Sequence, residues 1–261
     1  ATIVSGLDTL ANLHLISTSQ AATVTTTATA KAGTADEAII LSNGAAQAGA
    51  MTATYDGLEI INFNAAGTTG SATRSLTLAS ADLEKIVVTG DAAANVTANF
   101  VGAEFDTQTA TFDASAAGGS ITASVTKGAS ALAAVTMSAQ NDTLIYAGAL
   151  SETTVLVGGG GVDTLRLSTD VAYVAAATTQ TGSGVSGFEV LQLMGGTDVD
   201  ELSLTNNAGI TQVASFGAGS YKNATALAGI TQLVGGAFTT DLATDGSADA
   251  LTVNLASSAA L

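Results

Sequence analysis

The stretch Gly158–Leu193, GGGGVDTLRLSTDVAYVAAATTQTGSGVSGFEVLQL, decides the fold because it contains two turns that each lead into a short apolar run. The first turn is glycine-rich and ends at Asp163, and Leu165 and Leu167 follow at alternate positions. The second turn is VSGFE, residues 185–189, and a second apolar run follows it. Alternation of this kind is typical of half-buried strands, and consecutive glycines permit a tight turn. We interpret the rest of the chain as variations on these two turns.

Comparable turns recur along the chain at a loose period of 20 to 25 residues. Asp36 and Glu59 are 23 residues apart, and Asp142 and Asp163 are 21 apart. We place these acidic or amide residues at equivalent positions of successive repeats: Glu59, Glu84, Glu189, Gln212 and Gln232. A regular period with turn residues in register is typical of a solenoid, and one coil of two or three short strands needs about this length.

Composition favours the same architecture. The chain has 261 residues, no proline and only 4% aromatic residues, so small side chains dominate. Proline would remove a donor from a β-ladder, and threonine, valine and glycine are poor helix formers. The sequence therefore predicts an all-β parallel β-helix, or β-solenoid, with calcium-binding turns. We expect one continuous solenoid over residues 1–261, cut from a larger surface protein, with a subdivision near residue 150 as the alternative.

Charge limits the classes of partner. Six Lys and Arg against 22 Asp and Glu give a formal net charge of −16. Nucleic acids and anionic membranes attract cationic surfaces, so neither is expected as a partner. No apolar run reaches the roughly 18 to 20 residues that a membrane helix needs. There is no cysteine, which excludes disulfides and thiol chemistry. A divalent cation is the simplest partner for such a chain, although acidity also serves solubility alone.

Stacked coils bring the acidic turns close together. Coils of a β-helix lie ~4.8 Å apart, and two carboxylates at that separation repel by about 3 kcal/mol at an effective dielectric of 20. Ca²⁺ accepts six to eight oxygen ligands in flexible geometry and would reverse this repulsion. The candidate calcium ligands are Asp36, Asp142, Asp163, Asp198, Asp200, Asp249, Glu59 and Glu189. Two alternatives remain: the aspartates bond their own turns, and the glutamates accept hydrogen bonds from backbone amides at a coil corner.

Catalytic patterns are weak. His14 is the only histidine, so a zinc site or a Ser-His-Asp triad would depend on that residue, which lies in a strand-like segment. The glycines at 158–161 are not followed by the Lys-Ser/Thr of a phosphate-binding loop. We therefore expect the protein not to be an enzyme, with a β-helical polysaccharide enzyme as the less favoured alternative.

Four segments carry a resemblance to a known family. They are Lys85–Gly90 with Phe112–Ala116 downstream, the turn Gly160–Leu165, and Val185–Leu191. With these motifs the chain resembles the surface-layer (S-layer) proteins of Caulobacter-type bacteria and, more loosely, the RTX proteins. The resemblance implies secretion to the bacterial cell surface, calcium-dependent folding, a β-solenoid body and self-assembly into a two-dimensional lattice. It also implies anchoring to lipopolysaccharide through a part outside this chain.

Two functions follow as expectations. The first is a structural S-layer protein whose partner is itself, in a calcium-dependent lattice or filament on the outer surface. The second is an RTX-type adhesin or biofilm matrix protein, which would bind a ligand or surface without forming a lattice. A comparison of assemblies with and without calcium separates them.

Overall fold

The computed structural model describes the strands along the chain and, in its central part, the turns between them. The backbone is described for residues 2–7, 13–16, 22–26, 37–42, 51–54, 60–67, 72–79, 83–100, 110–127, 133–148, 154–167, 184–194, 201–203, 209–215, 219–224, 229–232, 238–242 and 253–255. Side chains are described for residues 60–67, 72–78, 83–100, 110–126, 134–148, 154–167, 184–194 and 209–214. Within the described part of the chain, no helix is long and apolar enough to span a lipid bilayer.

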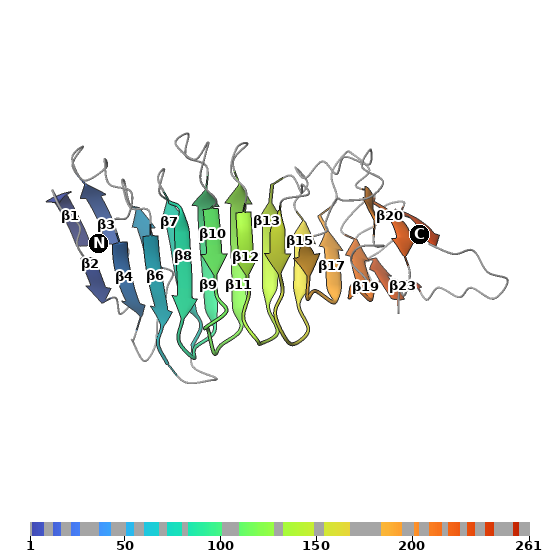
Figure 1. Ribbon diagram of the computed structural model, residues 1–261, viewed down its shortest axis with the longest axis horizontal. Helices are drawn as coiled ribbons and strands as arrows, with labels where there is room; N and C mark the ends of the chain where they lie inside the picture. Colours follow the sequence, from blue (N-terminus) through green and yellow to red (C-terminus); the bar gives the residue numbers. More distant parts are fainter. Residues whose placement is uncertain are drawn as a thin grey trace.

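Alternate strands of the described chain belong to two long parallel sheets, so each circuit of the chain adds one strand to each (Figure 1). Sheet A has 12 strands: β1 (Thr2–Leu7), β3 (Ala22–Thr26), β5 (Met51–Thr54), β7 (Arg74–Ala79), β9 (Ala94–Phe100), β11 (Ile121–Lys127), β13 (Thr143–Ala147), β15 (Thr164–Leu167), β17 (Val190–Leu193), β19 (Gln212–Ser215), β21 (Gly229–Gln232) and β23 (Val253–Leu255). Sheet B has eight: β2 (Leu13–Ile16), β4 (Glu37–Ser42), β6 (Ile60–Ala65), β8 (Lys85–Thr89), β10 (Ala110–Asp113), β12 (Ala133–Thr136), β14 (Val155–Val157) and β16 (Val185–Ser186).

Among the described residues, β16 is the last strand of sheet B, whereas sheet A includes four later strands. Three later strands form a small parallel sheet of their own: β18 (Glu201–Ser203), β20 (Gly219–Ala224) and β22 (Phe238–Leu242). The predicted all-β parallel solenoid is confirmed by this arrangement. The apolar runs 39–41, 60–63 and 86–88 lie in β4, β6 and β8, and His14 lies in β2.

Two columns of apolar side chains form the core between the sheets. On sheet A the column is Leu76, Val96, Ala123, Leu144, Leu165, Leu191 and Val213, each in register with the next and each buried. On sheet B it is Ile61, Ile86, Phe112, Val135, Leu156 and Val185. Because every second residue of a strand faces inward, the alternation in the sequence becomes a continuous core.

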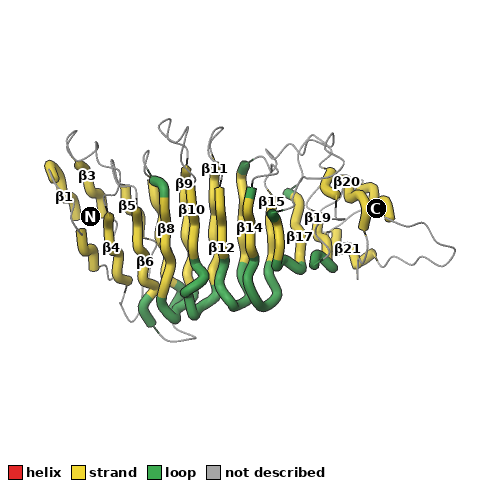
Figure 2. Tube along the Cα trace, viewed as in Figure 1, coloured by secondary structure: helices red, strands yellow, loops and turns green. Residues whose placement is uncertain are grey.

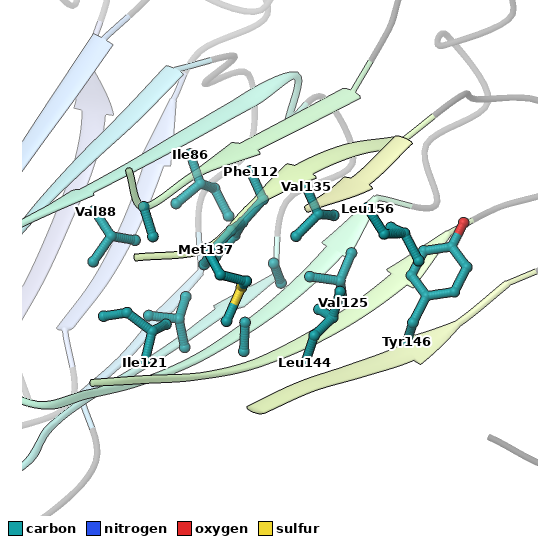
Figure 3. Packing of buried hydrophobic residues seen from close by; sticks show 14 of the residues in the cluster. Ile86, Val88, Phe112, Ile121, Val125, Val135, Met137, Leu144, Tyr146 and Leu156 are labelled. Carbon is teal, nitrogen blue, oxygen red and sulfur yellow. The ribbon is translucent and has the colours of Figure 1, made fainter. Parts of the chain in front are cut away.

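The two columns pack against each other across a thin interior. Figure 3 shows Phe112 and Val135 of sheet B pointing toward Val125 and Leu144 of sheet A. Burying one such side chain stabilises the fold by about 1.5 to 3 kcal/mol, so the stack gains stability with every coil. Small inward residues, such as Ala123, are also fully buried in this core.

The described turns of the central coils lie along one edge of the stack (Figure 2). On this side the chain leaves a strand of sheet B, turns, and enters the next strand of sheet A. The residue that immediately precedes a sheet A strand therefore stacks on the matching residue of the next coil. The predicted acidic turns at Asp142, Asp163 and Glu189 lie here.

Candidate metal centre

Asp142, Asp163 and Glu189 stack in three successive coils, and we call this group the acidic corner. They immediately precede β13, β15 and β17. The register of these strands pairs Thr143 with Thr164 and Thr164 with Val190, which places the three acidic residues directly beside one another. The sequence predicted this stacking correctly for Asp142 and Asp163, whereas it grouped Glu189 with Glu59, Glu84, Gln212 and Gln232.

A directional chain of hydrogen bonds connects the acidic corner. The backbone N–H of Ile121 donates to Asp142 Oδ1 at 2.6 Å. The N–H of Asp142 donates to Asp163 Oδ1 at 2.7 Å, and the N–H of Asp163 donates to Glu189 Oε2 at 2.7 Å. These partners are 21, 21 and 26 residues apart, so each carboxylate accepts the amide of the preceding coil. The last coil is one residue longer than the predicted period.

The main chain continues the same stack with ordinary ladder bonds. Thr164 N–H donates to the carbonyl of Asp142 at 2.9 Å, and Val190 N–H donates to the carbonyl of Asp163 at 3.0 Å. Each acidic residue thus joins its neighbours through both its backbone and its carboxylate. For Glu189, this confirms the alternative interpretation from the sequence, in which a glutamate accepts an amide hydrogen at a coil corner. Asp142 and Asp163 bond a neighbouring coil's amide in the same way.

Asp142 is the most heavily bonded member of the corner. Its side chain is 2% exposed. Besides the Ile121 amide, it accepts the backbone N–H of Ser138 at 2.7 Å and the Ser138 hydroxyl at 2.8 Å, both at Oδ2. Burial raises the pKa of Asp142, and the hydrogen bonds from Ile121 and Ser138 oppose that rise. Ser138 was not a candidate from the sequence, because its distance of four residues from Asp142 matches no motif.

The glycine-rich turn lets the coils approach closely enough for these bonds. Gly159 and Gly161 have φ values of +105° and +112°, which side chains rarely adopt. A Cβ on Gly161 would lie 2.8 Å from the Gln140 carbonyl oxygen of the preceding coil. Beside it, the Val162 N–H donates to Asn141 Oδ1 at 2.9 Å. The turn is therefore fixed by backbone proximity as well as by its own conformation.

Asp163 is the residue of the acidic corner whose carboxylate is buried with one oxygen unpaired and whose pKa is raised most clearly. Its side chain is 0% exposed, and its Oδ2 is buried without a hydrogen-bond donor. Burial raises the pKa of Asp163 to about 6, the Asp142 amide lowers it, and the negative charges of Asp142 and Glu189 raise it. A buried carboxylate beside two like charges is favourable only when a proton or a cation compensates it.

This burial predicts acid stabilisation of the metal-free protein. The folded-state pKa of Asp163 lies above its ordinary value of 3.8. The stability that the fold has with Asp163 protonated is therefore fully present below pH 3.8 and is lost as the pH rises through about 6. At 1.36 kcal/mol per pKa unit the loss is about 3 kcal/mol. Urea unfolding in a chelator, measured from about pH 3.5 to 8 so that both pKa values are covered, should show a midpoint that falls as the pH rises. Asp163→Asn should flatten the fall, and an unchanged profile in that variant would contradict the assignment.

The acidic corner fits a calcium ion in part. Among the described residues, no group of three or more His, Cys, Asp or Glu side chains has the geometry to hold a metal ion. Asp142 does not fit as a ligand, because amide and hydroxyl hydrogens already occupy both of its oxygens. Asp163 Oδ2 does fit, because it is a buried acceptor with no donor. Glu189 is half-buried beside it and uses Oε2 for the Asp163 amide.

One feature of the predicted repeat is wrong. Glu84 precedes β8 of sheet B, whereas Glu189 precedes β17 of sheet A, so they are not at equivalent positions. Gln212 is displaced by one residue, because it pairs with Val190 and not with Glu189. Both kinds of turn lead into a parallel strand and have the same local pattern, so the pattern does not distinguish the sheets. The remaining candidates lie outside the described residues: Asp36, Glu59, Asp198, Asp200 and Asp249.

Comparison of this chain with known proteins finds no matching family model, no matching curated protein and no matching solved structure.

Proposed function

We propose that this chain is the β-solenoid body of a secreted structural protein that assembles with copies of itself into a calcium-dependent S-layer on the bacterial surface. The role is mechanical and not catalytic. The fold supports the proposal because parallel coils add stability repeat by repeat and give a long, regular body. The resemblance of the motifs at 85–90, 112–116, 160–165 and 185–191 supports the surface-layer setting.

The observation that carries the calcium part is the unpaired Asp163 Oδ2. This oxygen is buried, and its residue lies between Asp142 and Glu189 of the neighbouring coils in a chain of net charge −16. Asp163 and Glu189 would supply carboxylate oxygens to the ion, while Asp142 stays bonded to amides. When bound, Ca²⁺ supplies positive charge and accepts further oxygens, including backbone carbonyls of the glycine turn. The amide bonds of the corner hold the two carboxylates in place.

Calcium is expected to stabilise the wild-type chain and to order its assemblies. At free Ca²⁺ about a hundredfold above the dissociation constant, stability should rise by about 2 to 3 kcal/mol. Thermal unfolding in Ca²⁺, in Mg²⁺ and in EGTA measures this rise. Electron microscopy of the same samples should show ordered two-dimensional lattices that dissolve in EGTA.

Two variants separate the site from general charge screening. Asp163→Asn should lose most of the calcium response, because its buried carboxylate is gone. Asp113→Asn removes one carboxylate from β10 on sheet B and should keep the full response. An equal calcium response in both variants would show that calcium does not bind at the acidic corner. Lattices that persist unchanged in EGTA would contradict the proposal that assembly depends on calcium.

A further inference from the structure

A polar depression spans three coils beside the acidic corner. Its volume is about 350 Å³, within the range of small-ligand sites. It lies where the turns before β9, β11 and β13 meet. The lining residues are Asp91, Ala93, Gly118, Gly119, Ser120, Gln140 and Asn141.

The lining offers both hydrogen-bond donors and acceptors. Asp91 is exposed and presents a carboxylate, and Ser120 and Gln140 are exposed polar side chains. Asn141 Oδ1 already accepts the Val162 amide, so the Asn141 side chain has its NH₂ group left to donate. A lone carboxylate beside amide donors suits a ligand that itself both donates and accepts hydrogen bonds.

Next to the depression, the described outward side of sheet A is uncharged. Ser120 and Asn141 are followed, two residues later on the same outward side, by Thr122 and Thr143, which are partners in the β11–β13 ladder. The described outward side chains of β7, β9 and β11 are all Ser, Thr or Asn, and we call them the hydroxyl–amide face. They are Ser75, Thr77, Asn95, Thr97, Asn99, Thr122, Ser124 and Thr126.

We propose that the depression and the hydroxyl–amide face bind a neutral oligosaccharide. Anionic ligands are disfavoured by Asp91 and by the net charge of −16. A bare cation is disfavoured by the Asn141 NH₂ group, and an apolar ligand by the polar lining. Vicinal hydroxyls match a carboxylate that accepts two hydrogen bonds beside amides that donate. Strands ~4.8 Å apart repeat these groups at about the length of one sugar ring, so an extended chain can contact successive coils.

Titration calorimetry with cellohexaose and maltohexaose tests the proposal, with hexagalacturonate as the acidic counterpart. Binding of at least one neutral hexamer at millimolar or lower concentration is expected, and hexagalacturonate should bind more weakly. Asp91→Asn, Gln140→Ala and Thr122→Val should each weaken binding by about three- to tenfold, as expected for one lost hydrogen bond. Asp113→Asn, on the opposite sheet, is the matched control and should bind as the wild type does.

The outcomes are distinct from those of the calcium experiment. All titrations use Ca²⁺-containing buffer and proteins whose circular dichroism matches the wild type, and Asp163→Asn should keep saccharide binding. The proposal is overturned when no neutral hexamer binds or when hexagalacturonate binds more tightly. It is also overturned when Asp91→Asn and Gln140→Ala leave the affinity unchanged, because the saccharide then binds elsewhere.

Discussion

Asp142→Ala is expected to lower the free energy of unfolding by about 3 to 6 kcal/mol, because it leaves two buried backbone amides without an acceptor. These are the N–H groups of Ile121 and Ser138, which donate to Asp142 at 2.6 and 2.7 Å. The Ser138 hydroxyl also loses its carboxylate partner but retains the Gly119 carbonyl at 3.3 Å. Urea unfolding followed by circular dichroism measures the loss.

Asp113→Ala is the matched control for this substitution. Asp113 is half-buried on β10, and among the described residues it accepts hydrogen bonds from its own short turn, from Ser115 N and Oγ at 3.0 and 2.7 Å. Those bonds are exposed to solvent, so the control should lose about 1 kcal/mol or less. Equal losses in both variants would show that the carboxylate of Asp142 does not join the coils.

Gly159→Ala should destabilise the solenoid by about 3 to 5 kcal/mol, because it combines a disfavoured backbone angle with a steric overlap. The φ of Gly159 is +105°, and a Cβ there would overlap the carbonyl oxygen of Ser138 in the preceding coil. The Ser138 backbone cannot move away without lengthening the hydrogen bond that its N–H donates to Asp142. Thermal or urea unfolding measures the effect.

The neighbouring residue provides a close control. A Cβ on Gly160 would meet nothing nearer than the Ala139 Cα at 3.8 Å, which is an ordinary contact. Gly160→Ala should therefore change stability by less than about 1 kcal/mol, and the gain in chain stiffness acts in its favour. If Gly159→Ala is as mild as Gly160→Ala, the close stacking of this turn is not required for the fold.

The acidic corner shows which features of the site can be predicted from the sequence and which cannot. The 21-residue spacing of Asp142 and Asp163 is visible in the sequence, and it correctly predicts that they stack in adjacent coils. The role of Ser138 is not visible, because its hydrogen bonds depend on how its turn folds back toward Asp142. The same holds for Asp91 and Asn141, which are far apart in the chain and line one depression.

The sequence by itself determined the architecture: alternating apolar residues, small side chains and recurring turns are local properties, and they suffice for parallel strands that stack with a period of about one coil. Only the tertiary structure decided which turn serves which sheet, which carboxylate accepts which amide, and that Asp163 is left with a buried, unpaired oxygen. The physical reason is that a strand pattern has the same period in both sheets. Hydrogen bonding and burial, by contrast, depend on the coil that lies above and the coil that lies below.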